Sequence, residues 1–145
     1  MSDEEVADFL ATSRTVTCAT NGRDGWPHLM PLWYVLRGGQ LWGWTYAKSQ
    51  KVRNLERDRR CTLQLEAGSE YSELRGVMLA CDAVIHRDLD TVSGIGAELA
   101  ARYGGADLSP ELATSMRAQA AKRVGLQFVE RDRATWDHGK LGGVY

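Results

Sequence analysis

The pattern of apolar and polar residues divides this chain into strand-like and helix-like segments. Residue types and alternation typical of strands occur in residues 15–20, 28–37, 40–47, 60–66, 74–87 and 123–131. Apolar residues spaced three and four apart, or helix start and stop signals, occur in residues 3–11, 51–57, 90–103 and 109–121. About six strands and three to four short helices, joined mostly by hairpin-length connections, predict a small antiparallel β-barrel with appended helices.

The hairpin predicted across Gly38-Gly39 is apolar on both faces. A two-glycine turn adopts the primed geometry and pairs residues whose numbers sum to 77, so we expect Trp33 to face Trp44. On the other side Tyr34 would face Gly43, and a strand glycine often marks close approach by a ligand or backbone. In a small domain such a hairpin normally exposes one face to solvent. Because both faces are apolar here, we expect a barrel interior on one side and a partner subunit or flat ligand on the other.

Charge is concentrated in one segment of the chain. The 145 residues carry a net charge of -1, whereas residues 48–60 hold six cations against two carboxylates. The hydrophobic fraction of the whole chain, 43%, excludes a disordered protein. Its length predicts a single domain over residues 1–145. A general nucleic-acid binder is more often basic across a whole face, so a confined basic segment favours a small anion.

Other kinds of site find little support in the sequence. The histidines are scattered, so we expect no metal site, and neither a complete catalytic triad nor a phosphate-binding P-loop can be assembled. The odd and widely spaced cysteines are interpreted as buried thiols of a reducing compartment; they are Cys18, Cys61 and Cys81. An acidic start and the lack of a membrane-length apolar run predict a cytoplasmic protein without membrane contact.

The aromatic strand 40–47 runs directly into the basic helix. Backbone N–H groups at a helix start attract anions, and Lys48, Ser49, Lys51 and Arg53 add charge and a hydroxyl. A ligand with a phosphate at one end and a flat ring at the other fits this order, which describes a flavin-type cofactor. The alternatives from the residues alone are a solvated helix face and single-stranded nucleic-acid binding with stacking aromatics, the latter disfavoured by the net charge.

Two segments carry a resemblance to a known superfamily. Trp44-Thr45-Tyr46 through Ser49-Gln50-Lys51-Val52-Arg53-Asn54-Leu55 to Asp58-Arg59-Arg60-Cys61-Thr62-Leu63 resembles the Y-T-N-x-x-S-x-K-x-x-x-L-x-x-N-P-x-V-x-L segment of the pyridoxamine 5'-phosphate oxidase-like split β-barrel proteins. Gly25-Trp26-Pro27-His28 to Pro31-Leu32-Trp33-Tyr34 is similar to the start of the flavin/deazaflavin oxidoreductases of the B group, many of which use coenzyme F420. The order of elements matches from residue 15 to residue 128.

This resemblance implies a fold that is mainly β with α, a split antiparallel β-barrel of the FMN-binding type, and a homodimer with the cofactor at the subunit interface. The phosphate end would be bound by Lys48, Ser49, Lys51, Arg53 and Asn54. The ring would be lined by Met30, Pro31, Leu32 and Trp33. The partner chain would cover the cofactor with its tail, through Trp136, His138 and Lys140.

The implied activity is that of an F420-dependent oxidoreductase acting on an electron-poor small molecule. The Arg and Lys of the R-x-x-L-L-K strand of true pyridoxamine phosphate oxidases are missing here, as is their longer C-terminal region, whereas the deazaflavin branch tolerates both differences. No side chain stands out as an obligatory acid, so water or Tyr34 would supply the proton. The alternatives are an FMN-binding flavoprotein of the same fold and a non-catalytic module that binds flavin, F420 or haem.

Overall fold

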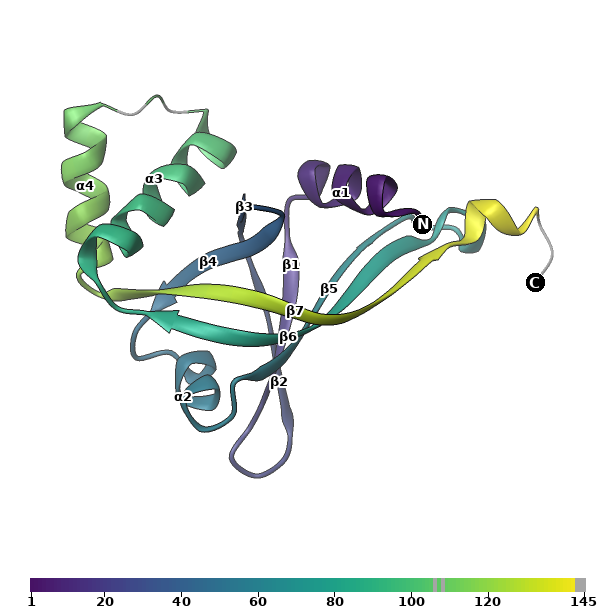
Figure 1. Ribbon diagram of the computed structural model, residues 1–145, viewed down its shortest axis with the longest axis horizontal. Coiled ribbons are helices and arrows are strands. Elements are labelled where there is room, and N and C mark those ends of the chain that lie inside the picture. The colour runs from purple at the N-terminus through teal and green to yellow at the C-terminus, as the bar shows by residue number, and fades with distance from the viewer. Residues whose placement is uncertain (106, 108, 143–145) are drawn as a thin grey trace.

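The chain folds into a curled antiparallel sheet with helices at its ends, as the computed structural model shows for residues 1–105, 107 and 109–142 (Figure 1). The strands within these residues are β1 (Val16–Asn21), β2 (Pro27–Leu32), β3 (Val35–Arg37), β4 (Gln40–Tyr46), β5 (Arg60–Ala67), β6 (Arg75–His86) and β7 (Arg123–Asp137). The helices are α1 (Asp3–Thr12), α2 (Gln50–Arg57), α3 (Leu89–Gly104) and α4 (Pro110–Ala120), with short 3-10 turns η1 (Tyr71–Glu73) and η2 (His138–Leu141). The predicted fold class, a mainly-β split barrel with short helices, is confirmed.

The seven described strands form one sheet in the order β2-β1-β5-β6-β7-β4-β3. The β6 and β7 strands make the longest ladder, which has a register shift at Ala80/Cys81. In Figure 1 the α3–α4 hairpin lies at one end of these long strands and the end of β7 with η2 lies at the other. Within one chain, the fold therefore places the tail that follows β7 far from the α3–α4 hairpin.

The barrel interior is built from the alternate, inward residues of the strands. The inward side chains of β1, β5, β6 and β7 include Val16, Leu63, Leu79 and Phe128, all nearly or fully buried. Helix α1 closes one end with Val6, Phe9 and Leu10, and its start is fixed by a capping box between Ser2 and Glu5. The three thiols Cys18, Cys61 and Cys81 are free and buried in this core, as predicted.

The predicted strand over residues 28–37 is wrong, because it is two strands. After β2 the chain breaks at Trp33-Tyr34 and continues as β3. Strands β2 and β3 lie at opposite edges of the sheet, so the connecting residues must leave the ladder to reach the second edge. The register across the glycine turn is confirmed by the pair Val35 and Trp42.

The break also separates two tryptophans that the sequence had paired. Trp44 is opposite Gly125 of β7, not Trp33. Gly43 permits a close approach, as predicted, but of other groups than Tyr34: an added Cβ there would lie 2.6 Å from Leu32 Cδ1 and 3.2 Å from the Trp33 carbonyl oxygen. Strand β7 also runs six residues beyond its predicted end, to Asp137.

Candidate functional site

A cavity of about 690 Å³ lies where the strand ends meet the α3–α4 hairpin. Its walls come from the end of β2, the end of β4, the first turn of α2, helices α3 and α4 and the first residue of β7. The lining residues are Met30, Pro31, Leu32, Trp33, Trp44, Thr45, Tyr46, Lys51, Gly96, Leu99, Ala100, Tyr103, Gly104, Met116, Gln119 and Arg123. The cavity is thus mainly apolar and aromatic, with two cations and no carboxylate among its lining residues.

One wall is a pair of stacked aromatic rings. Trp33 lies parallel to Tyr103, with ring centroids 4.3 Å apart and an interplanar angle of 3°. The Tyr103 hydroxyl accepts the Tyr34 backbone N–H at 3.1 Å and lies 2.8 Å from the Arg14 carbonyl oxygen, so its ring is fixed. Trp33 remains 56% exposed and presents a flat, positioned surface on which a ring system can stack.

Lys51 supplies a buried cation that has no carboxylate partner in the described residues. The residue is 6% exposed, and its neighbours Val52 and Leu55 belong to the apolar core. Within the described residues its ammonium makes neither a hydrogen bond nor an ion pair, and burial lowers its pKa. An unpaired buried cation is unfavourable, so the fold holds Lys51 in a state that an anionic ligand in the cavity would relieve.

The start of α2 uses several predicted phosphate ligands for structure instead. Ser49 is the N-cap, and its hydroxyl accepts the Val52 N–H at 3.3 Å. Asn54 is fully buried and its side-chain Nδ2 donates to Thr20 Oγ1 at 3.0 Å, while its side-chain Oδ1 accepts from Gln50 and Arg57. Of the five residues predicted for the phosphate end, the structure brings only Lys51 to the cavity. Lys48, Ser49, Arg53 and Asn54 are not among its lining residues.

The four residues predicted to line a ring do meet in this cavity. Met30, Pro31, Leu32 and Trp33 follow one another through the end of β2 and line it together with Lys51. Helix α2 contacts β1, which pairs with β2, so its first turn lies on the same side of the sheet edge as these residues. Whether they contact a cofactor stays a prediction.

The predicted tail residues lie elsewhere in this chain. The end of β7 and η2 are at the opposite end of the sheet from α3 and α4 (Figure 1). The Trp136 ring covers Gly76, where an added Cβ would lie 2.3 Å from Trp136 Cζ2, and His138 Nδ1 lies 2.9 Å from the Tyr71 carbonyl oxygen. Within one chain these residues cannot reach the cavity, so a covering role requires a second copy.

Lys140 ties the tail to the N-terminal helix. Its ammonium lies 2.8 Å from both carboxylate oxygens of Glu5. This contact, with the Ser2 backbone N–H, lowers the pKa of Glu5 to about 2. In the single chain Lys140 is therefore engaged by its own α1.

Tyr34 is a core residue, so its predicted role as proton donor is not supported by its position. The residue is fully buried, and its hydroxyl donates toward the carbonyl oxygens of Leu10 and Ser13. Burial raises the pKa of Tyr34 to about 12. The hydroxyl therefore holds α1 and the following turn against the barrel, and Tyr34 is not among the residues that line the cavity.

Tyr34→Phe is expected to lower the free energy of unfolding by about 1 kcal/mol, because it removes the Tyr34 hydroxyl from the Leu10 and Ser13 carbonyl oxygens and leaves them to Arg102. Ligand affinity and turnover should stay at the wild-type level. Denaturant unfolding followed by circular dichroism measures the stability, and Tyr46→Phe, at an exposed tyrosine, is the matched control with a change within about 0.5 kcal/mol. A Tyr34→Phe protein of normal stability that lost turnover would restore the catalytic role.

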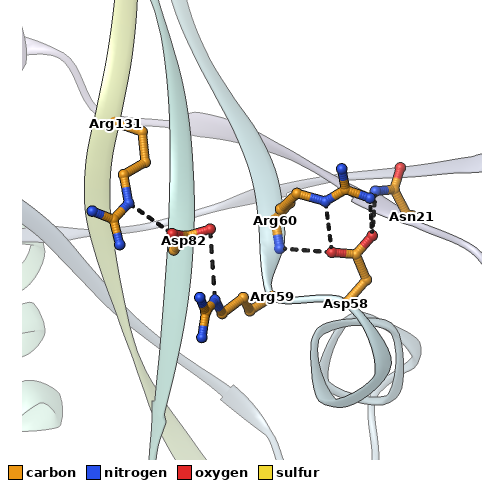
Figure 2. A network of polar contacts seen from close by, with 6 residues as sticks. All are labelled: Asn21, Asp58, Arg59, Arg60, Asp82 and Arg131. Carbon is orange, nitrogen blue, oxygen red and sulfur yellow. Dashed lines mark hydrogen bonds and ion pairs between the residues drawn. The ribbon is translucent and has the colours of Figure 1, made fainter.

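Part of the basic segment is neutralised on the outer face of the sheet. Figure 2 shows Asp58 between Arg60 at 2.8 Å and Asn21 at 3.0 Å, and Asp82 between Arg131 at 2.7 Å and Arg59 at 3.8 Å. The hydrogen bond from Arg60 holds the pKa of Asp58 below its usual range. Two of the six cations counted in residues 48–60 are therefore committed to ion pairs, which concentrates the free positive charge nearer to α2.

Sequence reasoning missed the half of the cavity that α3, α4 and β7 supply. Gly96, Tyr103 and Arg123 are separated in sequence from the β2–α2 region and converge only because α3 packs over β4 and β7. One signal was present: Gly96, Ala100 and Gly104 recur every fourth residue and so share a face of α3. An added Cβ at Gly96 would lie 2.4 Å from the Trp44 ring, so this small-residue face admits the indole.

None of the helices in the described part of the chain is long and apolar enough to cross a membrane. The same residues contain no group of three or more His, Cys, Asp or Glu side chains placed to hold a metal ion.

Comparison with known proteins identifies similar sequences and folds. The model of the family described as pyridoxamine 5'-phosphate oxidase matches residues 2–136. The conserved hypothetical protein Rv2991 from Mycobacterium tuberculosis is 41% identical with a TM-score of 0.92, over 100% of this chain and 90% of that chain. None of the curated proteins matches.

Two more distant structures share the fold. An F420 reductase is 20% identical with a TM-score of 0.69, over 88% of this chain and 94% of that chain. A FAD-binding protein from Mesorhizobium loti is 16% identical with a TM-score of 0.70, over 93% of this chain and 94% of that chain.

Proposed function

Since the chain belongs to the pyridoxamine 5'-phosphate oxidase family, we propose that its cavity binds coenzyme F420 and that the protein is an F420-dependent oxidoreductase. The observation that carries this proposal is Lys51, a 6% exposed lysine without a partner in the described residues, which faces a mainly aromatic cavity. A flat ring with an anionic group satisfies both features at once. The F420 reductase of the same fold adds support for the choice of cofactor.

The lining residues fit such a cofactor in their chemistry. Lys51 would neutralise the phosphate, and Trp33, held parallel to Tyr103, would stack against the ring. F420, when bound, supplies hydride transfer between its deazaflavin ring and an electron-poor small molecule such as an enone or a conjugated heterocycle. The protein's own contribution is to bind, orient and shield the reacting groups.

Helices α3 and α4 would exclude water from the reacting face. Leu99, Ala100 and Met116 give this wall an apolar surface, and a drier site strengthens the attraction between Lys51 and an anion. Tyr34 is not among the lining residues, so water at the open side of the cavity, away from α3 and α4, would supply the proton that accompanies hydride transfer.

We further propose that the working protein is a homodimer. The exposed apolar residues along β2 and at its two ends include Trp26 at 75%, Leu29 at 58% and Trp33 at 56%, and Trp33 also lines the cavity. Exposed apolar groups of this size along one edge strand are typical of an interaction surface. A second copy placed there could cover the ring with its Trp136 and Lys140, after Lys140 leaves Glu5.

The alternative cofactor is FMN, which has the same combination of ring and phosphate. The FAD-binding relative supports a flavin in this fold as much as the F420 reductase supports a deazaflavin. A non-catalytic module that carries flavin, F420 or haem is the alternative outside the enzymes, and turnover with a reduced cofactor and an enone distinguishes it.

Titration of the purified protein with F420, and separately with FMN, is expected to quench tryptophan fluorescence more strongly with F420. Trp33 and Trp44 line the cavity, whereas Trp26 is exposed and outside its lining. The Trp26→Phe variant therefore removes tryptophan fluorescence that a ligand in the cavity would not quench. Trp33→Phe in that background should lose much of the quenching. Preference for FMN would select the alternative cofactor, and no response to either would contradict the proposed function.

A further inference from the structure

A second hollow of about 490 Å³ adjoins the cavity beyond Arg123. It is bounded by the end of β4, the last turns of α4 and the first residue of β7. Its lining residues are Tyr46, Ser115, Ala118, Gln119, Lys122 and Arg123, of which Tyr46, Gln119 and Arg123 also line the main cavity. Arg123 therefore stands where the two spaces meet.

The Arg123 guanidinium is fixed over two aromatic rings. Its central carbon lies 4.7 Å from the Trp44 ring centroid and 4.3 Å from that of Tyr46, because Tyr46 is its direct cross-strand partner. One N–H group donates to the Gln119 carbonyl oxygen at 3.1 Å. Of the five N–H donors of an arginine, this is the one that has an acceptor in the described residues.

The lack of an acidic partner sets Arg123 apart from Arg37 and Arg117. Arg37 of β3 pairs with Glu98 of α3 at 2.7 Å, and Arg117 of α4 pairs with Asp90 of α3 at 2.7 Å. Arg123 has no such pair within the described chain, and neither hollow has a carboxylate among its lining residues. Lys122 lines the second hollow but not the main cavity and adds a cation that has no ion pair among the described residues.

From this arrangement we propose that Arg123, assisted by Lys122, is a subsite for the carboxylate of an aromatic or conjugated organic acid. The planar fork of an arginine matches the two oxygens of a carboxylate, and Trp44 and Tyr46 hold the fork in place. The acid would lie with its ring in the main cavity and its carboxylate at the junction. The proposal uses the same cavity as the proposed function but a cation other than Lys51.

The carboxylate could belong to the substrate or to an acidic tail of the cofactor. Both sources share the chemistry that Arg123 recognises. In the first case the hydride acceptor is an unsaturated carboxylic acid, and in the second Arg123 contributes to cofactor affinity.

The test compares 2-naphthoate with 2-naphthamide, which have the same ring and nearly the same shape but differ in charge. Binding to the cofactor-free protein is measured by calorimetry. The wild-type protein should bind the acid about tenfold more tightly, which is the size expected for charge-assisted hydrogen bonds in a half-open site. Arg123→Gln should abolish the preference, and Arg123→Lys, which keeps the charge without the fork, should retain part of it.

Two further variants make the outcome specific. Arg117→Gln removes an exposed arginine of α4 that lies outside both hollows and should keep the tenfold preference. A preference that survives Arg123→Gln but disappears in Lys51→Met places the carboxylate at Lys51 and overturns the proposal. Equal binding of the acid and the amide by the wild-type protein also overturns it.

Repetition of the titration with saturating F420 distinguishes the two sources of the carboxylate. If the preference persists and Arg123→Gln leaves F420 affinity unchanged, the carboxylate that Arg123 binds in function is that of the substrate. If F420 abolishes the preference, and Arg123→Gln lowers the affinity for F420 but not for FMN, which has no carboxylate, it is that of the cofactor. Because the first titration needs no cofactor, failure to bind F420 or FMN would count against the proposed function and not against this subsite.

Discussion

Lys51→Met is expected to make the cofactor-free protein more stable and to remove most of its affinity for the cofactor. The wild-type ammonium is buried without a partner in the described residues, and its replacement by an apolar side chain of similar length removes a penalty of about 1–2 kcal/mol. The midpoint of thermal unfolding should rise by a few degrees. Affinity for F420 or FMN should fall by about 10- to 100-fold, since a charge-assisted hydrogen bond to the phosphate is lost.

Lys48→Met is the matched control for this result. Lys48 is exposed, belongs to the same basic segment and does not line the cavity. It should leave the unfolding temperature unchanged and reduce affinity only slightly, by long-range attraction. Equal losses of affinity in the two variants would move the anion site from the cavity to the outer end of α2.

The pH dependence of the stability difference gives an independent check. Burial lowers the pKa of Lys51 from its usual value of 10.5, so the folded state binds fewer protons than the unfolded state between the lowered value and 10.5. The stability of the wild-type protein relative to Lys51→Met should therefore rise with pH through that window. The advantage of the variant is full below the lowered pKa and disappears above pH 10.5; a pH-independent difference would show that it has another cause.

Gly96→Ala and Gly94→Ala are expected to change stability in opposite directions. Both glycines lie inside α3, where alanine is favoured over glycine by about 1 kcal/mol. At Gly94 the nearest atom to an added Cβ is Arg37 Nη2 at 3.4 Å, whereas at Gly96 two Trp44 ring atoms lie at 2.4 and 2.5 Å. Gly94→Ala should thus stabilise the protein, while Gly96→Ala should destabilise it by about 1–3 kcal/mol through overpacking.

The same pair of variants tests the cavity wall. Displacement of Trp44 by the methyl group that Gly96→Ala adds would also disturb the ring beneath Arg123, so this variant should weaken binding of 2-naphthoate. Gly94→Ala lies outside the cavity lining and should bind it normally. Denaturant unfolding and calorimetry measure the two effects, and a stable Gly96→Ala protein with normal binding would show that α3 and Trp44 are not in firm contact.

Local sequence signals located most of the elements but could not show where the chain changes its pairing partner. The Gly38-Gly39 turn specifies its own register, because a two-residue hairpin fixes which residues oppose each other. Trp33 and Tyr34 are apolar residues between apolar neighbours, so nothing local marks them as the point where the chain leaves one sheet edge for the other. Tyr34 leaves the ladder because its hydroxyl is held by carbonyl groups of α1 and the following turn, a contact between distant segments.

Some residues of the candidate site could be predicted from local sequence signals, and others could not. Residues 30–33 and Lys51 were predictable, since motif and charge placed them beside a strand end and a helix start. Ser49 and Asn54 carry the same motif, but their polar groups are used in a helix cap and a buried hydrogen-bond network. Arg123 and Tyr103 were not predictable, because their roles depend on α3 crossing β4 and β7.

The cavity walls come from segments that lie far apart along the chain, and this makes ligand discovery simpler. Trp33, Lys51, Tyr103 and Arg123 come together only in the folded protein, so the unfolded chain should have almost no affinity for a ligand that needs them together. By mass action, a compound at one hundred times its dissociation constant then stabilises the folded state by about 2.7 kcal/mol. A library of cofactors and organic acids can therefore be ranked by thermal shift alone, before any reaction is known.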